Sequence, residues 1–169
     1  MKLDFTYFEN GIDRISGQLP GMPQDRVVLN RLFFYVFMEL DDVYNQHLSK
    51  FGLNSSTFLA LAMILGSENN RLNPSHLSEA LIASRTSVTR MTDELVDSGW
   101  VIRSPGTQDR RRVELSLTPS GRQLILEVLP AIWKRIEQQW SDFSPDEVAE
   151  FGRLLRKMLD GLQRFRAAA

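Results

Sequence analysis

A short stretch near the middle of the chain carries four arginines and a single acidic residue. Residues 100–112 therefore have a local excess of three positive charges, whereas the whole 169-residue chain has a formal net charge of −1. Guanidinium groups form paired hydrogen bonds with phosphates and guanine edges, so this pattern favours local contact with nucleic acid. A charge run that is only solvated is the alternative. The charged residues of the stretch are Arg103, Asp109, Arg110, Arg111 and Arg112.

A second set of polar and basic residues begins the helix that the sequence predicts over residues 84–98. Apolar residues recur at helical spacing from Val88 to Leu95, and the acidic residues lie toward the far end of the helix. A recognition helix presents mainly its N-terminal residues to bases, so this gradient suits a DNA reader. An ordinary amphipathic surface helix is the alternative. The predicted DNA-contacting residues of this helix are Arg85, Thr86, Ser87, Thr89 and Arg90.

The surrounding pattern predicts a scaffold of short helices followed by a β-hairpin. The pairs Phe51-Gly52 and Asn73-Pro74 are a helix stop and a helix start ahead of residues 84–98. Two strand-like runs, 100–104 and 112–117, enclose the arginine-rich turn. The order of three helices and a hairpin is that of a winged helix-turn-helix, which we place at residues 53–118. Such a helix fits the major groove, and its basic loop can reach the adjacent minor groove.

Both ends of the chain predict helices with apolar surface to cover. Residues 27–48 read as a long helix that is apolar on most sides of its first half, and such a helix must be enclosed. A capping box at 144–147 opens a last helix whose apolar residues have coiled-coil spacing. Packing on the chain's own core is the alternative. We expect a homodimer, with residues 1–52 as an N-terminal arm and dimerisation helix and residues 119–169 as C-terminal dimerisation helices. The expected fold is mainly α with a small β-hairpin wing.

The composition excludes several other classes of protein. The chain has no cysteine and two histidines, which excludes thiolate catalysis and the usual structural zinc sites. It also lacks a Gly-rich phosphate loop and the common hydrolase motifs, so we expect neither an enzyme nor a bound cofactor or metal. No basic stretch leads into an apolar run at the N-terminus, and no segment reaches about 18 uninterrupted apolar residues. We therefore expect a cytoplasmic protein without membrane contact.

The stretch from Ser78 to Gly121 resembles the signature of the MarR family of transcriptional regulators. In that family a recognition helix ending in Asp-x-Leu-x-x-x-Gly leads to a wing with Asp-x-Arg and then Leu-Thr-x-x-Gly. The resemblance covers residues 24–165. The segments before and within the winged helix-turn-helix at residues 53–118, called the reader below, are most similar to the EmrR/MprA branch, which represses multidrug-efflux operons. The matching residues are Thr89, Arg90, Leu95, Gly99, Asp109, Arg111, Leu117, Thr118 and Gly121.

The resemblance implies a repressor that binds a pseudo-palindromic double-stranded DNA operator as a homodimer. It also implies that Arg111 enters the minor groove while Asp109 fixes its rotamer. Members of this family release DNA when a small aromatic or phenolic effector binds between the dimerisation helices and the reader. A winged-helix module for protein–protein interaction, without sequence-specific DNA binding, is the alternative function. Packing in the core or in the interface is the alternative for each residue that we expect to bind the effector. These residues are Arg31, Phe34, Met38, Phe58, Met63 and Trp133.

Overall fold

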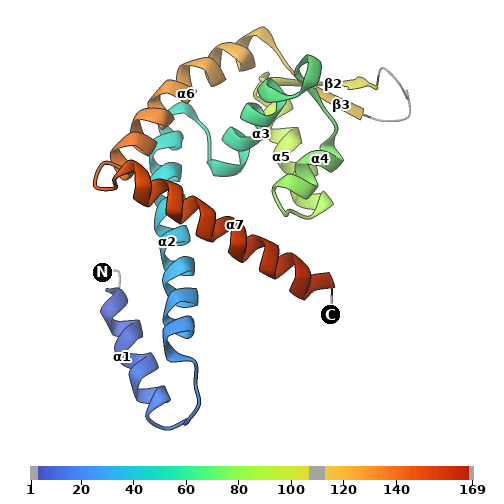
Figure 1. The fold of residues 1–169 in the computed structure, drawn as a ribbon. Helices are drawn as coiled ribbons and strands as arrows, with labels where there is room; N and C mark the ends of the chain where they lie inside the picture. Colours follow the sequence, from blue (N-terminus) through green and yellow to red (C-terminus); the bar gives the residue numbers. More distant parts are fainter. Residues whose placement is uncertain (1–3, 107–112, 168–169) are drawn as a thin grey trace. The chain divides into compact units, whose positions relative to one another are not determined.

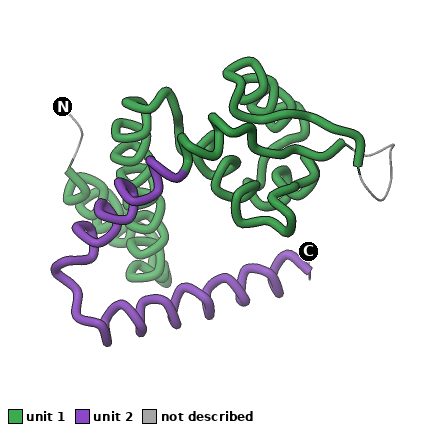
Figure 2. The backbone as a smooth tube through the Cα atoms, turned by 90° about the horizontal axis from the view of Figure 1, so that it is seen from above, with its two compact units in different colours: residues 1–125 green, residues 126–169 purple. Residues whose placement is uncertain are grey.

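The computed structural model describes residues 4–106 and 113–167, which form two compact units (Figures 1 and 2). The first unit, residues 1–125, contains five α-helices, a three-stranded sheet and the start of a sixth helix. The second unit, residues 126–169, contains the rest of that helix and a seventh. The predicted fold class is confirmed, because the chain is mainly helical with a small antiparallel sheet.

Two helices open the first unit and lie side by side (Figures 1 and 2). Helix α1 (Phe5–Ser16) ends before a segment rich in proline and glycine, after which α2 (Gln24–Leu48) begins. The ring of Tyr35 on α2 contacts the rings of Phe5 and Phe8 on α1, with centroid distances of 5.5 and 6.1 Å. The predicted N-terminal arm is therefore a helix that packs its aromatic side chains on α2.

The helices of the reader begin at side-chain caps. The Asn54 side chain accepts from the Thr57 backbone N–H at 2.9 Å, and the Thr57 hydroxyl accepts from the Asn54 backbone N–H at 2.9 Å. Asn73 caps the next helix in a similar way, and Ser84 accepts from the Ser87 backbone N–H at 3.1 Å. These bonds satisfy amide groups that a helix leaves unpaired in its first turn. The bounds are η1 Ser49–Phe51, α3 Ser55–Gly66, η2 Glu68–Asn70, α4 Pro74–Ala80 and α5 Arg85–Asp97.

The strands form an antiparallel sheet in the order β1-β3-β2. The predicted hairpin is confirmed as β2 and β3, with Val101 paired to Leu117 and Arg103 paired to Leu115. Strand β1 was not predicted, because a two-residue strand is too short to show an alternating pattern. The bounds are β1 Arg71–Leu72, β2 Val101–Pro105 and β3 Val113–Leu117.

Helix α3 lies at the centre of the core of the first unit. Its side chains Ala60, Leu61 and Ile64 are completely buried, as are Leu77 of α4 and Leu95 of α5. Burial of each leucine or isoleucine side chain stabilises the fold by about 1.5–3 kcal/mol. Among the described residues no single helix is long and apolar enough to cross a membrane; α2 with η1, and α3, meet that test only as a pair bent by 73°.

The turn after α5 connects three elements of the first unit. Gly99 has a φ of +71°, and its N–H and that of Trp100 bond to carbonyls in the last turn of α5 at 2.9 and 3.0 Å. Glycine adopts this left-handed conformation without strain. The Thr118 hydroxyl donates to the Gly99 carbonyl at 2.7 Å and accepts from the N–H of Gly121, in the first turn of α6 (Pro119–Gln139), at 3.0 Å. The end of α5, the start of β2 and the start of α6 are therefore joined at one point.

The second unit contains the C-terminal part of α6 and the last helix, joined by a short turn. Its last helix, α7 (Pro145–Ala167), begins at the predicted capping box: the Ser144 backbone N–H donates to the Glu147 carboxylate at 2.8 Å, and the Glu147 backbone N–H donates to the Ser144 hydroxyl at 3.3 Å. The hydrogen bonds from Ser144 lower the pKa of Glu147. The ring of Trp140 packs on Phe143 and Phe151, with centroids 5.1 and 5.7 Å away, and closes the turn between the helices.

Replacement of Gly121 by alanine tests the contact between α6 and the turn after α5. A Cβ at Gly121 would overlap the carbonyl oxygen of Trp100, a backbone atom that no side-chain rotation can move. We expect Gly121→Ala to lower the free energy of unfolding by about 1–3 kcal/mol or more in urea titrations. Gly66→Ala is the matched control, because a Cβ there meets no described heavy atom within 4 Å. Equal stability of the two variants would contradict this packing.

Candidate nucleic-acid interface

Helix α5 has one buried face and one exposed face. The buried face packs into the core of the first unit and carries Val88, Met91, Thr92 and Leu95. The predicted DNA-contacting residues all lie on the exposed side, within the first two turns of the helix. The structure thus brings together, on one solvent-facing surface, Arg85, Thr86, Ser87, Thr89 and Arg90.

The first turn of α5 is suited to hold an anion. It contains no acidic residue, and the N-terminal end of a helix carries a partial positive charge. The Ser84 and Ser87 hydroxyls are 2.8 Å apart and form one hydrogen bond, in which either oxygen can be the donor. The Thr89 hydroxyl donates to the Arg85 carbonyl at 2.9 Å, so Thr89 offers a partner its oxygen lone pairs and its methyl group. This end of α5 can therefore bind phosphate and present small polar groups to base edges.

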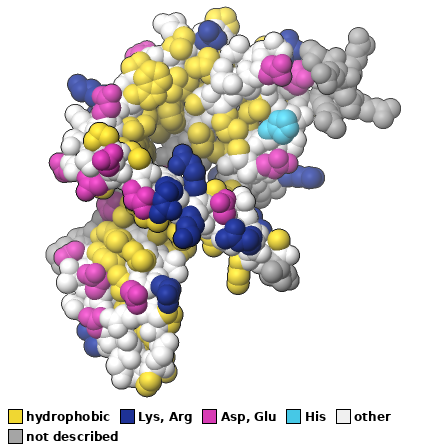
Figure 3. Space-filling view, in the orientation of Figure 1, with side chains coloured by type: hydrophobic (Ala, Val, Ile, Leu, Met, Phe, Trp, Pro, Cys, Tyr) yellow, Lys and Arg dark blue, Asp and Glu magenta, His cyan; other side chains and the backbone are white. Residues whose placement is uncertain are grey.

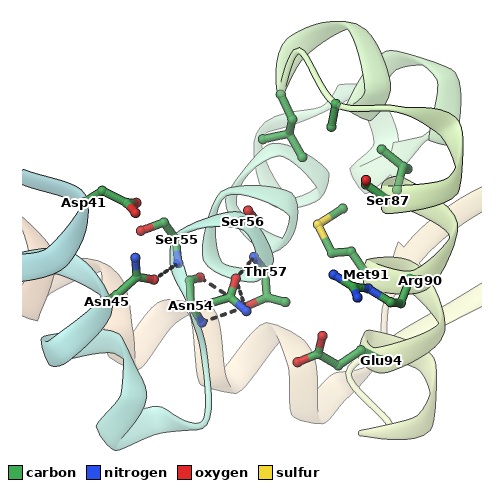
Figure 4. A pocket seen from close by; sticks show the side chains of 13 residues that line it. Asp41, Asn45, Asn54, Ser55, Ser56, Thr57, Ser87, Arg90, Met91 and Glu94 are labelled. Carbon is green, nitrogen blue, oxygen red and sulfur yellow. Dashed lines mark hydrogen bonds between the residues drawn. The ribbon is translucent and has the colours of Figure 1, made fainter. Parts of the chain in front are cut away.

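A polar cavity of ≈ 380 Å³ lies beside α5 (Figure 4). Arg90 and Glu94 extend into it from α5 and point toward the N-terminal turn of α3. Arg90 and Glu94 have the i,i+4 spacing of helical ion pairs, but no ion pair joins them among the described contacts. The Asn45 side chain on α2 accepts from the Ser55 backbone N–H at 2.7 Å, which holds the start of α3 to α2. The lining residues are Asp41, Asn45, Asn54, Ser55, Ser56, Thr57, Leu81, Ala83, Ser87, Val88, Arg90, Met91 and Glu94.

The base of the wing is held by polar contacts on two sides. Arg103 of β2 donates to the Asp93 carboxylate at 2.5 Å and to the Thr92 hydroxyl at 2.6 Å, both on α5. Strand β3 is held on its other side by an ion pair of 3.2 Å between Arg71 and Glu114. Sequence spacing gives no sign that Asp93 and Thr92 are partners of Arg103. The residues predicted for the wing tip, Asp109, Arg110, Arg111 and Arg112, lie outside the described residues.

Two of the predicted effector-binding residues share a second cavity. Arg31 and Met38 line a space of ≈ 510 Å³ whose walls come from α1 and α2, and the Arg31 guanidinium lies 4.2 Å from the centre of the Phe8 ring. Phe8 was missed because the sequence analysis treated the N-terminal segment only as an arm. The described residues contain no group of His, Asp and Glu side chains arranged to hold a metal ion. The other predicted residues line neither cavity: Phe34 is on α2, Phe58 and Met63 are on α3, and Trp133 belongs to the second unit.

Comparisons with known proteins agree on the class of this chain. Residues 53–113 match a family model described as the MarR family. The transcriptional repressor MprA of Escherichia coli K12 is 34% identical over 97% of this chain and 93% of its own length. A cysteine-to-serine mutant of E. coli MarR, solved in complex with operator DNA, is 28% identical over 82% of this chain and 98% of that chain, with a TM-score of 0.72. Bordetella bronchiseptica BpsR, whose DNA binding is regulated by 6-hydroxynicotinic acid, shares the fold, with 22% identity over 78% of this chain and 92% of that chain and a TM-score of 0.69.

Substitutions at Ser84 test whether the N-terminus of α5 faces phosphate. Aspartate caps a helix as well as serine does, so Ser84→Asp is expected to keep stability within about 0.5 kcal/mol. Its added carboxylate should nevertheless weaken DNA binding about tenfold or more, since a like charge at about 4 Å costs about 1–4 kcal/mol near a protein surface. Ser84→Ala is the control, which loses about 1 kcal/mol of capping without adding charge. Binding is measured by fluorescence anisotropy on a duplex that the wild-type protein selects from a random pool. Wild-type affinity of Ser84→Asp would show that this helix end does not face DNA.

Proposed function

The chain belongs to the MarR family of transcriptional regulators, and on that premise we propose that it represses transcription by binding a pseudo-palindromic operator as a homodimer. The observation that carries DNA binding is the surface of α5, where exposed basic and hydroxyl side chains fill the first two turns opposite a buried apolar face. Similarity to the repressor MprA supports repression. Likeness to the MarR–operator complex supports binding to double-stranded DNA.

In this proposal the N-terminal half of α5 enters the major groove and the wing reaches the adjacent minor groove. Arg111 would lie in the minor groove, with Asp109 holding its guanidinium in place. The narrow groove has an enhanced negative potential, which favours an inserted arginine. The proposed major-groove residues are Arg85, Thr86, Ser87, Thr89 and Arg90, and Arg110 and Arg112 would meet the flanking phosphates.

Apolar side chains on two long helices support a homodimer. Phe34, Phe37 and Met38 of α2 are 60, 62 and 64% exposed, and Leu162 and Phe165 of α7 are 55 and 76% exposed. In Figure 3 hydrophobic side chains gather on the surface where Figure 1 places α1 and α2. Apolar surface of this extent is unfavourable in water, and a second copy of the chain would cover it. A two-fold dimer would read half-sites about one helical turn apart.

The cavity between α1 and α2 supports a small aromatic effector. Its rings suit an aromatic compound, and the Arg31 guanidinium suits a carboxylate or phenolate. Asp41 and Asn45 line both this cavity and the one beside α5. Because Asn45 also holds the start of α3, a ligand that moves this wall would change the support of the reader.

Arg111→Ala tests the proposed wing contact. We expect operator affinity to fall about tenfold or more and the log–log salt slope to become shallower by about 1, because one cation in the negative potential of the minor groove is lost. The melting temperature should change little. Lys50→Ala, which removes an exposed charge from η1, is the control and should bind like the wild type. A normal titration of Arg111→Ala would exclude this role, and a flat salt dependence of the wild type would favour a protein–protein module.

Salicylate tests the effector proposal because it combines an aromatic ring with a carboxylate. At millimolar concentration it should both weaken operator binding and raise the melting temperature of the free protein, since a ligand that prefers one state shifts both equilibria. Arg31→Gln should bind the operator normally and lose the response to salicylate. Arg26→Gln on the same helix is the matched control, because Arg26 lines neither of the two cavities. An unchanged response in Arg31→Gln would exclude this cavity as the site.

A further inference from the structure

Arg103 lies on the inner face of the wing. The β2–β3 register sets Val101 opposite Leu117 and Arg103 opposite Leu115. Because side chains alternate along a strand, Arg103 shares a face with Val101. Val101 and Leu115 are only 1 and 0% exposed, whereas Ile102 on the other face is 51% exposed. The Arg103 side chain therefore leaves the hairpin on the side of the core, next to α5.

The guanidinium of Arg103 ends on the recognition helix. Nη1 donates to Oδ1 of Asp93 at 2.5 Å, and Nη2 donates to the Thr92 hydroxyl at 2.6 Å. The Thr92 side chain is 1% exposed, and its hydroxyl in turn donates to the Thr89 carbonyl at 2.9 Å. The hydroxyl of Thr92 is thus satisfied both as acceptor and as donor, and a buried polar group needs such partners. The chain of bonds runs from β2 into the second turn of α5, where Thr89 belongs to the exposed face.

This arrangement also explains an acidic residue on the reader. Asp93 is 50% exposed on a helix that is proposed to approach phosphates. A free carboxylate there would repel DNA, but its pairing with Arg103 neutralises that charge. The same ion pair joins β2 to α5, so one contact both removes repulsion and sets the position of the wing.

We propose that Arg103 is a positioning residue that fixes the wing to the recognition helix and does not itself contact DNA. The proposal rests on the proposed DNA-binding function. The contacts of Arg103 would hold the hairpin at the angle at which α5 and the wing reach adjacent grooves together. Removal of the negative charge of Asp93 should therefore weaken operator binding, because it breaks the contact with Arg103. If Arg103 instead contacted DNA directly, loss of the Asp93 charge would not weaken binding.

The decisive variant is Asp93→Asn, which removes a negative charge from the reader and breaks the ion pair. We expect operator binding about tenfold weaker than wild type, with an unchanged log–log salt slope and a melting temperature within a few degrees. Asp97→Asn is the matched control, because it removes an exposed carboxylate from the same helix without touching Arg103. It should bind as tightly as the wild type or more tightly. The double charge reversal Arg103→Asp with Asp93→Arg should recover part of the affinity that either single reversal loses.

A structural readout separates positioning from simple loss of stability. The chain has no cysteine, so spin labels attach only at introduced cysteines. With labels at Ile102→Cys on β2 and Glu94→Cys on α5, Asp93→Asn should broaden the distance distribution of the folded protein.

The proposal is overturned if Asp93→Asn binds DNA as tightly as the wild type, or if Arg103→Gln makes the salt slope shallower by about 1, as a lost phosphate contact would. These outcomes leave the wild-type affinity and the Arg111→Ala result unaffected, so they are distinguishable from a failure of the proposed function. Failure of the wild type to bind any selected duplex would instead overturn the function itself.

Discussion

The turn at Gly99 is the constraint on which the reader depends. Its left-handed backbone ends α5 and directs the chain into β2, and its carbonyl accepts the hydroxyl of Thr118 at the start of α6. Gly121 then lets α6 approach the backbone of Trp100 more closely than any side chain would allow. The motif residues after the wing are therefore structural: they join the recognition helix, the wing and the connecting helix at one rigid point. A reader that must reach two grooves at once needs such a joint.

The distribution of charge explains how a chain with a net charge of −1 can approach DNA. On α5 the two arginines lie in the first two turns, the sequence adds four more arginines in residues 100–112, and the carboxylate of Asp93 is paired with Arg103. Affinity from so small a surface is limited, since each phosphate contact contributes separately. In the proposed homodimer, two readers held at a fixed spacing would overcome this limit, and the apolar faces of α2 and α7 would then serve DNA binding as well as packing.

Helix α2 links the two cavities of the first unit. Asp41 and Asn45 line both of them, and Asn45 also holds the N-terminus of α3 through the Ser55 amide. Phe8 of α1 lines the larger cavity, with its ring against the guanidinium of Arg31. A ligand in that cavity would therefore act on the same wall that borders Ser87 and Arg90 of the reader.

The sequence by itself determined the features that depend on neighbouring residues. The caps at Asn54, Asn73, Ser84 and Ser144 are bonds between residues no more than three positions apart, and the hairpin and the family signature are equally local. Tertiary structure alone decided the contacts between residues that are far apart in the sequence, because local sequence pattern does not specify which distant partner a side chain meets. It formed β1, stacked Arg31 on Phe8, and bonded Arg103 to Thr92 and Asp93. From its charge alone, Arg103 had been predicted to contact DNA. Because side chains alternate along a strand, the sequence already placed Arg103 on the same face of β2 as Val101. Only the pairing register showed that this face of the hairpin meets α5.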